Sequence, residues 1–236
     1  MVLAEKTIIL IPTFNEKENI SRLIPEILKI IPSISILVID DNSPDGTAGV
    51  VEKLSLQYPR VSLLKRLQNH GLGRSYIDGF NSVLHDFNYE HIVTMDADFS
   101  HDPKVIPAML IKLNDSDLVI GSRYIRGGRI ANWHFKRKIL SRFANYYVRL
   151  ILGLSVRDLT TGFTAFRKTA LKRINLTMIR SDGYAFLVEL KYRMIKNGGK
   201  FIEQPIVFNE RREGQSKMSA KVIWESIWLP WRLRIR

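Results

Sequence analysis

Short apolar runs alternate with helix-like segments along the first half of this chain, and that alternation limits the folds it can adopt. The strand-like runs are residues 7–12, 34–39, 61–64, 91–95 and 117–121. After the first run, apolar side chains such as Ile20, Leu23 and Ile27 recur at the spacing of one helix face. Strands that alternate with helices favour a mainly parallel sheet with right-handed crossovers. We therefore predict an α/β fold in which helices flank such a sheet.

The size and composition of the chain are those of a single domain with a well-filled core. It has 236 residues, of which 45% are hydrophobic, and it contains no cysteine. The absence of cysteine excludes disulfides, thiolate metal sites and a cysteine nucleophile. No secretory signal is evident at the N-terminus, and no apolar run reaches the ~20 residues needed to cross a bilayer. The sequence therefore predicts no membrane-spanning segment.

The positive charge of the chain is concentrated in one window. The formal net charge is +13, which favours an anionic partner such as nucleic acid, a membrane surface or a phosphorylated small molecule. No acidic residue lies between Asp117 and Asp158. The basic residues of this window are Arg123, Arg126, Arg129, Lys136, Arg137, Lys138, Arg142, Arg149 and Arg157. They predict a local cationic field rather than a diffuse excess of charge.

Polar clusters follow three of the predicted strands. They are Thr13–Glu16, Asp40–Asp41 and Asp96–Asp98. Ligands of open parallel sheets bind outside the carboxyl ends of the strands, so the three clusters should share one edge. Two carboxylates separated by one residue, as Asp96 and Asp98 are, can share a hard divalent cation that also bridges to substrate phosphates. The alternative is that these carboxylates only cap a helix or form a turn.

Asp41 is the best candidate for a nucleoside contact. A carboxylate at the end of a strand can accept hydrogen bonds from ribose hydroxyls or from a guanine edge. The alternative for Asp41 is a turn or cap, a role that Asp40 or Asp45 could fill instead. Thr47 is placed to cap a helix that would run through Leu54.

Two basic amphipathic segments lie toward the C-terminus. In residues 137–152, the apolar positions near one helix face are Ile139, Leu140, Phe143, Tyr147, Leu150 and Ile151. Such a helix packs its apolar face on the core or lies in a membrane interface, and core packing is the simpler interpretation here. The segment 217–236 combines three tryptophans with Arg232, Arg234 and Arg236, a mixture typical of an interfacial belt. We predict that this C-terminal segment contacts a membrane surface.

An ordered set of motifs covers nearly the whole chain. The motifs are residues 12–16, 40–47, 96–98, 121–124, 161–163 and 216–217. In this order they resemble the dolichyl (polyprenyl) phosphate mannose synthases of glycosyltransferase family 2. The resemblance implies a GT-A (Rossmann-like) fold with a mixed, mainly parallel sheet, and a catalytic domain over residues 1–216. It further implies mannose transfer from GDP-mannose to a polyprenyl (dolichyl) phosphate, with Mg²⁺ or Mn²⁺ as the divalent cation.

The resemblance also assigns site residues position by position. The donor-binding residues are Pro12, Phe14, Glu16, Ile39, Asp41, Asp96, Ala97, Asp98, Arg211 and Lys217. The metal ligands are Asp96 and Asp98, with Ser100, which stands where some relatives place Gln, as a further candidate. The acceptor-phosphate residues are Arg123, Arg137 and Ser141. Asp98, Arg123 and Arg137 are thus the predicted catalytic residues, and Arg211 and Lys217 belong to a basic loop that would close on the donor phosphates.

The implied reaction needs no strong base. A phosphate monoester is already ionised near neutral pH, so its oxygen can attack the anomeric carbon directly. We expect a single displacement with inversion, which gives a β-linked product from an α-linked donor. No histidine has a partner that the sequence can identify. Asp158 is the best remaining carboxylate on the acceptor side, either as a base or as a partner that orients an arginine.

Two other interpretations stay open. A related polyprenyl-phosphate glucosyltransferase that uses UDP-glucose would keep the same turn Asp96–Asp98, which we call the metal turn. A non-catalytic sugar-nucleotide-binding or nucleic-acid-binding protein is the alternative from a different class. Nucleic-acid binding would place aromatic residues along a basic groove, whereas here they cluster with aliphatic residues, so no nucleic acid is expected.

The expected partners follow from the same resemblance and from the charge. They are GDP-mannose, a polyprenyl phosphate, an anionic membrane surface and, as a further candidate, a separate membrane-anchoring subunit. The predicted location is the cytoplasm, with peripheral attachment to the cytoplasmic face of a membrane.

Overall fold

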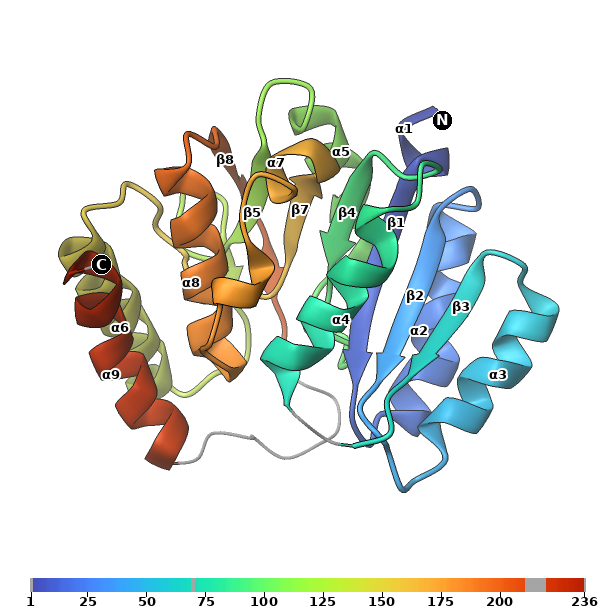
Figure 1. Cartoon of the computed structure of the whole chain (residues 1–236). Helices are drawn as coiled ribbons and strands as arrows, with labels where there is room; N and C mark the ends of the chain where they lie inside the picture. The colour runs from blue at the N-terminus through green and yellow to red at the C-terminus, as the bar shows by residue number, and fades with distance from the viewer. Residues whose placement is uncertain (1, 69–70, 211–219, 236) are drawn as a thin grey trace.

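A seven-stranded sheet forms the centre of the molecule, and helices cover both of its faces (Figure 1). The computed structural model describes residues 2–68, 71–210 and 220–235. Within these ranges the strands of the sheet are β1 (Thr7–Thr13), β2 (Ser35–Asp40), β3 (Val61–Lys65), β4 (His91–Thr94), β5 (Leu118–Ser122), β7 (Thr164–Arg167) and β8 (Phe201–Pro205). Their order across the sheet is β3-β2-β1-β4-β7-β5-β8.

Strand β7 gives the sheet its mixed character. It pairs antiparallel with β4 on one side and with β5 on the other. The remaining pairs of this sheet are parallel. The predicted α/β fold with a mixed, mainly parallel sheet is therefore confirmed.

Helices connect the strands and flank the sheet. They are α1 (Val2–Glu5), α2 (Lys17–Ile30), α3 (Thr47–Gln57), α4 (Leu72–Leu84), α5 (Ile106–Lys112), α6 (Phe135–Leu152), α7 (Lys168–Leu171), α8 (Gly183–Lys196) and α9 (Ala220–Ile235). Two short 3₁₀ helices span Pro103–Val105 (η1) and Leu176–Met178 (η2). A separate ladder joins β6 (Arg129–Ile130) and β9 (Val207–Phe208) in parallel.

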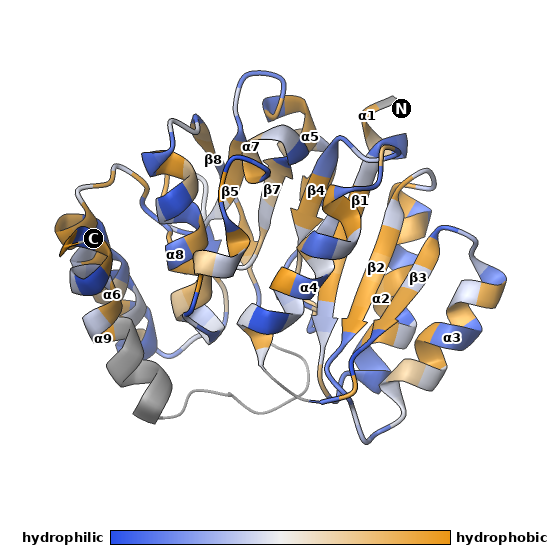
Figure 2. Cartoon of the chain, viewed as in Figure 1, coloured by the Kyte–Doolittle hydropathy of each residue, from blue (hydrophilic) through white to orange (hydrophobic). Residues whose placement is uncertain are grey.

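Alternation along the strands divides the buried core into two layers. In β1, Ile8 and Leu10 belong to one buried cluster with side chains of α4 and α8, whereas Ile9 and Ile11 belong to a second cluster with side chains of α2 and α5. Successive side chains of a strand point to opposite faces, so a strand covered on both faces is apolar throughout. Figure 2 shows the central strands as continuous hydrophobic ribbons between mixed helices.

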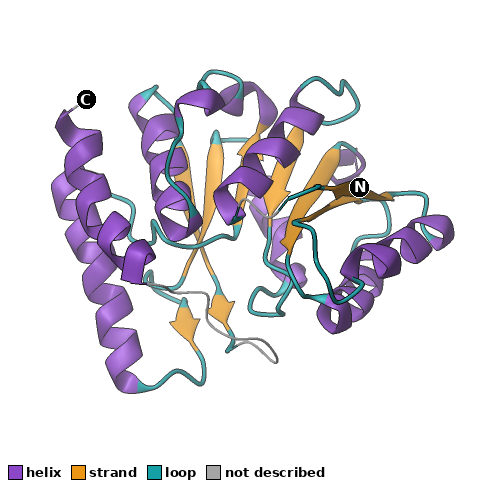
Figure 3. Ribbon diagram, turned by 60° about the horizontal axis from the view of Figure 1, so that its bottom comes forward, coloured by secondary structure: helices purple, strands orange, loops and turns teal. Residues whose placement is uncertain are grey.

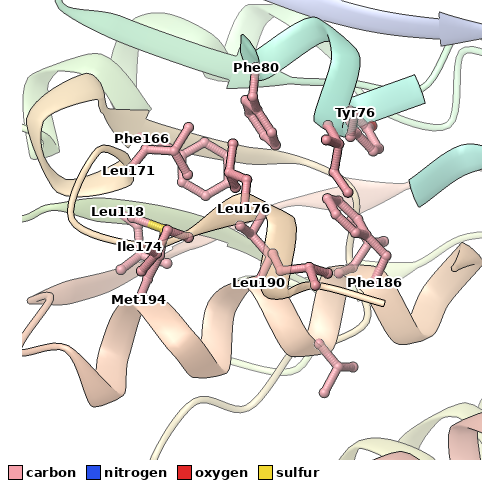
Figure 4. Packing of buried hydrophobic residues seen from close by; sticks show 14 of the residues in the cluster. Tyr76, Phe80, Leu118, Phe166, Leu171, Ile174, Leu176, Phe186, Leu190 and Met194 are labelled. Atoms are coloured by element: carbon pink, nitrogen blue, oxygen red, sulfur yellow. The ribbon is translucent and has the colours of Figure 1, made fainter. Parts of the chain in front are cut away.

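Aromatic side chains fill the layer between the sheet and helices α4 and α8 (Figure 4). The ring of Tyr76 stacks on the rings of Phe80 and Phe186, with centroid separations of 6.0 and 5.8 Å. Phe166 of β7 meets Phe80 edge to face. Buried aromatic pairs in these geometries stabilise a core beyond the area that they bury. This layer therefore fixes α8 rigidly against α4 and the sheet.

The start of α3 differs from the sequence prediction. Thr47 is the first helical residue rather than the cap, and Gly46 precedes it with a left-handed φ of 88°. The carboxylate of Asp45 accepts hydrogen bonds from the backbone N–H of Thr47 (2.9 Å) and from its hydroxyl (2.6 Å). The Thr47 oxygen in turn accepts a hydrogen bond from the backbone N–H of Glu16 (3.1 Å). The prediction that Thr47 caps α3 was therefore wrong, because Gly46 is the cap residue, Asp45 accepts the hydrogen bond of the first helical N–H, and Thr47 ties this turn to the loop after β1.

Helix α6 also corrects an expectation. Four of the six apolar side chains expected on its core-facing side are more than half exposed: Ile139, Leu140, Phe143 and Leu150. The face that packs on the domain instead carries Asn145, Val148, Ile151 and Leu152. Core packing was therefore the wrong interpretation for most of the apolar positions of α6. Several exposed apolar side chains on one helix are typical of an interaction surface.

Helix α9 lies beside α6 and α8 in two views of the molecule (Figures 1 and 3). Leu229 and Leu233 are buried in the same cluster as the side chains of α8. The indole N–H of Trp231 donates a hydrogen bond to the Tyr147 hydroxyl (2.9 Å), which donates to the carbonyl of Ile227 (2.9 Å). The C-terminal helix is therefore docked on the domain. Across the described ranges, every helix is too short or too polar to cross a membrane.

Candidate active site

A pocket opens where β1, β2 and β4 end and where α4 and α8 begin. Its lining residues are Pro12, Thr13, Phe14, Glu16, Asp41, Gly71, Leu72, Ser75, Asp96, Ala97, Asp98, Asp182, Gly183, Tyr184 and Leu187. All three polar clusters predicted at this edge therefore meet in one pocket, as parallel strands require. Seven predicted donor-binding residues line it: Pro12, Phe14, Glu16, Asp41, Asp96, Ala97 and Asp98.

One further predicted donor-binding residue does not line the pocket, and two lie outside the described residues. Ile39 is completely buried in the core, where its Cδ1 atom lies directly under Gly79 of α4, and it does not line the pocket. Arg211 and Lys217 lie outside the described residues. Their assignment to the donor phosphates stays a prediction.

The two aspartates after β2 have separate tasks. Asp40 is fully buried and accepts hydrogen bonds from the hydroxyls of Thr13 (3.0 Å) and Ser43 (2.6 Å), so it serves the turn. Asp41 lines the pocket and accepts hydrogen bonds from the Arg66 guanidinium and from the backbone N–H of Gly71 (3.0 Å). The side chain of Asp41 is thus held in a fixed position at the pocket wall, where a nucleoside hydroxyl can meet it.

The turn from Asp96 to Asp98 follows β4 directly. Asp98 accepts a hydrogen bond from the backbone N–H of Ser100 (3.1 Å) and is 5% exposed, whereas the Asp96 side chain is one-third exposed. Gly162 lies against Asp96, since a Cβ atom at position 162 would be 3.1 Å from the Asp96 Oδ1 atom. The two carboxylates therefore line the pocket, and Gly162 packs closely against the turn that carries them.

His101 is part of that support, although no partner for it could be identified from the sequence. Its Nδ1 atom accepts a hydrogen bond from the backbone N–H of Asp96 (3.2 Å), and its ring stacks on Phe163 at 4.9 Å. Burial lowers the pKa of His101, although Asp96 and Asp98 oppose that shift. The ring is therefore neutral at neutral pH, and it acts as a structural acceptor rather than a base.

Asp96 and Asp98 supply part of the ligand set that a hard divalent cation needs. Mg²⁺ and Mn²⁺ prefer oxygen ligands, and Mg²⁺ is usually bound by one or two carboxylates together with water and substrate phosphates. Asp96 and Asp98 provide that set at the pocket wall, and no cluster of three or more ligating side chains exists among the described residues. Ser100, the further candidate ligand, is fully buried and does not line the pocket. The side chains present thus fit a cation that substrate oxygens help to bind.

Arg123 is the first of the three predicted acceptor-phosphate residues. Its guanidinium donates two hydrogen bonds to the carboxylate of Asp158 (2.7 and 2.8 Å) and one to the hydroxyl of Thr160 (2.7 Å). Burial alone would raise the pKa of Asp158, but the charge and hydrogen bonds of Arg123 hold that pKa below its ordinary value. Asp158 is completely buried and fully engaged with Arg123. Of its two predicted roles, the structure supports the one that orients an arginine.

The other predicted acceptor-phosphate residues lie on α6. The Arg137 guanidinium sits 3.7 Å from the centroid of the Trp133 ring and 3.4 Å from the Glu210 carboxylate. Ser141 accepts a hydrogen bond from the hydroxyl of Tyr124 (2.7 Å), the residue that follows Arg123. Tyr124 therefore links the two parts of the predicted acceptor site, and Trp133 gives Arg137 a cation–π platform.

Sequence reasoning missed the wall that α4 and α8 contribute. Asp182, the cap of α8, accepts hydrogen bonds from the backbone N–H of Gly73 (2.5 Å) and of Gly183 (2.7 Å). Gly71 has a left-handed φ of 86°, and a Cβ there would lie 2.1 Å from the Asp182 carboxylate, so only glycine fits. Gly71 and Gly73 at the start of α4 were a visible signal, but their partner lies more than 100 residues away.

Comparison with known proteins identifies the family of the chain. Residues 8–174 match the model of the family described as "Glycosyl transferase family 2". The chain is 40% identical over 236 residues to a polyprenol monophosphomannose synthase from Mycolicibacterium smegmatis (98% of this chain, 89% of that protein). It is 39% identical over 222 residues to an undecaprenyl-phosphate mannosyltransferase from Micrococcus luteus (94% and 91%). A dolichol-phosphate mannosyltransferase from Pyrococcus furiosus is 37% identical over 226 residues (93% and 61%).

Solved structures support the fold independently. A glucosyl-3-phosphoglycerate synthase from Mycobacterium tuberculosis, solved with Mn²⁺, UDP-glucose and phosphoglyceric acid, superposes with a TM-score of 0.68 at 16% identity, covering 95% of this chain and 79% of that one. The same enzyme with Mg²⁺ and UDP gives a TM-score of 0.68 at 17% identity, with coverage of 95% and 79%. The predicted GT-A fold is therefore confirmed. The chain belongs to glycosyltransferase family 2, and it is a glycosyltransferase.

Proposed function

We propose that the protein transfers mannose from GDP-mannose to a polyprenyl phosphate, with inversion at the anomeric carbon. The relatives whose names describe mannose transfer to polyprenol or dolichol phosphates support the substrate class. The observation that carries the proposal is the loop Asp158–Phe163, which we call the bridging loop. It holds Arg123 through Asp158 and Thr160, and its Gly162 lies against Asp96. One loop thus contacts both a carboxylate predicted to serve the donor and an arginine predicted to serve the acceptor.

The reaction needs an anionic nucleophile and an anionic leaving group close together. An acceptor phosphate oxygen attacks the anomeric carbon, the bond from that carbon to the donor diphosphate oxygen breaks, and GDP leaves with the electron pair. No proton has to be removed, because the phosphate monoester is already ionised. Arg137 and the oriented Arg123 would place the acceptor phosphate and offset its repulsion from the donor. A divalent cation held by Asp96 and Asp98 would neutralise charge on the departing diphosphate.

An incorporation assay tests the donor and the stereochemistry. Purified protein is incubated with a short polyprenyl phosphate and with GDP-mannose, UDP-glucose or GDP-glucose in turn. The proposal requires GDP-mannose to give the highest kcat/KM and the product to be β-linked. Recovery of an α-linked product would refute the single displacement. Preference for UDP-glucose would favour the glucosyltransferase alternative.

Arg137→Ala tests the acceptor assignment within the same assay. Arg137 is about half exposed and contacts Trp133 and Glu210, so its removal leaves no buried charge unpaired. The apparent KM for polyprenyl phosphate should rise more than the KM for GDP-mannose. Equal effects on both would indicate that Arg137 has a general electrostatic role.

We further propose that α6 and α9 attach the enzyme to an anionic membrane surface on the cytoplasmic side. An exposed apolar stripe follows one side of α6, at intervals of three or four residues. It consists of Phe135, Ile139, Phe143, Tyr146 and Leu150. Trp228 and Trp231 of α9 are also exposed. Basic residues beside the stripe include Lys138, Arg142 and Arg149. Such a combination favours an interface rich in anionic lipids.

Vesicle flotation tests this attachment directly. Leu150→Ser, in the stripe, should reduce binding to vesicles that contain anionic lipid. Leu56→Ser is the matched control, because Leu56 is also strongly exposed but lies on α3 at the opposite end of the sheet (Figure 1). Equal binding of both variants would refute the proposal. Binding that requires an added membrane protein would favour a separate anchoring subunit.

A further inference from the structure

The amine of Lys191 is completely enclosed by the protein. Lys191 lies in the middle of α8 and is 1% exposed. Its Nζ atom donates hydrogen bonds to the carbonyls of Thr161 (2.7 Å), Leu159 (3.1 Å) and Leu187 (3.4 Å). A buried amine is costly unless all of its donors are satisfied. All three donors of this ammonium group can therefore be satisfied, each by a main-chain carbonyl.

Two of these three acceptors belong to the bridging loop. Leu159 and Thr161 flank Thr160, whose hydroxyl accepts a hydrogen bond from Arg123. The backbone N–H of Leu159 also donates to the side chain of Asn145 on α6 (2.8 Å). Lys191 therefore fastens the loop from α8 at the two positions on either side of an Arg123 contact.

The far end of the same loop reaches the metal turn. The carbonyl of Gly162 accepts a hydrogen bond from the hydroxyl of Thr94 (2.6 Å), at the end of β4. Gly162 also lies against the carboxylate of Asp96. A shift of the loop would thus move Arg123 and disturb the support of Asp96 together.

We propose that Lys191 is a positioning residue for the transfer reaction, because it fixes the distance between the acceptor arginine and the metal turn. The inference deepens the proposed function and rests on it. Lys191 does not line the donor pocket, so its action passes through the bridging loop. Misplacement of reacting groups by about 1 Å can cost 10²-fold in rate. We call the three hydrogen bonds of Lys191 the clamp. Loss of the clamp should therefore lower kcat more than it weakens donor binding.

Helix α8 offers well-matched control variants. Lys191→Met keeps the length of the side chain but removes the charge and all three hydrogen bonds. Lys196→Met makes the same change on an exposed turn of the same helix. Met194→Ala removes a buried side chain of α8 that belongs to the hydrophobic core, and so destabilises the helix while keeping Lys191 and the acceptors of its three hydrogen bonds. Each variant is assayed well below its own Tm.

The expected result is a fall in kcat of about 10- to 100-fold for Lys191→Met, with a KM for GDP-mannose within about twofold of the wild type. Lys196→Met and Met194→Ala should keep the wild-type kcat. If Met194→Ala loses as much kcat as Lys191→Met, the effect is one of stability and the proposal is refuted. Lys191→Gln, which retains amide donors, should recover part of the lost kcat, and it replaces Lys191→Met if that variant does not fold.

Hydrogen exchange gives a readout that is independent of turnover. The amides of residues 160–163 should exchange faster in Lys191→Met than in Met194→Ala at equal distance from Tm. Unchanged exchange would overturn the clamp even if activity fell. If the wild type does not transfer mannose to polyprenyl phosphate but the exchange difference is present, the proposed function fails while the clamp stands. If the wild type is active and Lys191→Met keeps its kcat, the clamp fails and the proposed function stands.

Discussion

Asp158→Asn tests whether this buried carboxylate serves an arginine rather than the substrate. Asp158 is completely buried, and its carboxylate accepts three hydrogen bonds from Arg123, which is 7% exposed. Asparagine keeps the shape of the side chain but removes the negative charge. It also turns one acceptor oxygen into a donor NH₂ group that faces another donor. Within the described part of the chain, Asp158 is the only carboxylate that forms an ion pair with Arg123, so the buried guanidinium would lose that counter-ion.

The magnitude follows from the burial of the pair. Breaking a buried ion pair by removal of one partner costs about 3–5 kcal/mol, and asparagine keeps one acceptor, so we expect a loss of about 3 kcal/mol. Glu90→Gln is the matched control, because Glu90 pairs with Lys6 at comparably short range but both side chains are about half exposed. An exposed pair contributes about 0–1 kcal/mol. The two variants should therefore differ in unfolding free energy by about 2 kcal/mol or more.

Urea unfolding at neutral pH measures the difference, and the pH dependence gives a second check. The pKa of Asp158 lies below the ordinary aspartate value of 3.8 because of Arg123. The contribution of the pair is therefore complete above that value and is lost as the pH falls through the lower folded pKa. The stability gap between wild type and Asp158→Asn should narrow in acid. Equal unfolding midpoints for Asp158→Asn and Glu90→Gln at neutral pH would refute the reasoning.

Activity separates the two roles of Asp158. A positioning role predicts a higher KM for polyprenyl phosphate, because Arg123 is no longer held in place. Loss of kcat with unchanged stability and unchanged KM would instead point to a base.

Three further predictions concern the metal turn and α8. Gly162→Ala should weaken the apparent affinity for Mn²⁺ in the turnover assay several-fold, because the added methyl group must displace the Asp96 carboxylate by a few tenths of an ångström, whereas Gly49→Ala meets open space and should leave it unchanged. Asp98→Ala should abolish metal-dependent transfer, and turnover at the wild-type rate would remove the metal assignment. Burial lowers the pKa of Lys191 to about 7, so above that pH the unfolded chain binds more protons than the folded protein. In urea unfolding at pH 7 and pH 9, the unfolding free energy of the wild type should therefore rise with pH relative to that of Lys191→Met. Parallel pH profiles of the two proteins would contradict the lowered pKa.

The sequence predicted five strands of the main sheet, β1 to β5, because their signals are local, whereas β7 and β8 were not predicted. Apolar runs that are buried on both faces and helices with a 3.6-residue period can be read without knowledge of the partners. The pocket was predictable for the same reason, since parallel strands bring their carboxyl ends to one edge. The loops after β1, β2 and β4 meet there as expected. Neither step required knowledge of a long-range contact.

The predictions for α6 and for the start of α3 were wrong because both features depend on tertiary contacts that a sequence pattern does not show. The pattern of α6 showed an apolar and a basic side, but the polar Asn145 packs inward because its side chain holds Leu159 and Thr160 of the bridging loop. That inward packing leaves Phe143 and its neighbours outside. Tertiary structure also sets the start of α3, where the left-handed Gly46 is the cap residue and Asp45 accepts the hydrogen bond of the Thr47 N–H. Periodicity shows that a helix has two sides, but it does not show which side meets the core.

The pairing of Arg123 has a consequence for how the acceptor would be recognised. Because Asp158 offsets the charge of Arg123, the net attraction for a phosphate must come largely from other cations of the acid-free window. Arg137 and Arg142 lie on α6, and Arg142 stands 5.8 Å from the ring centroid of Tyr124, beside Ser141. The same helix carries the exposed apolar stripe. Under the proposed function, one helix would therefore contact the lipid surface and draw the phosphate from it, while Arg123 supplies fixed geometry rather than net charge.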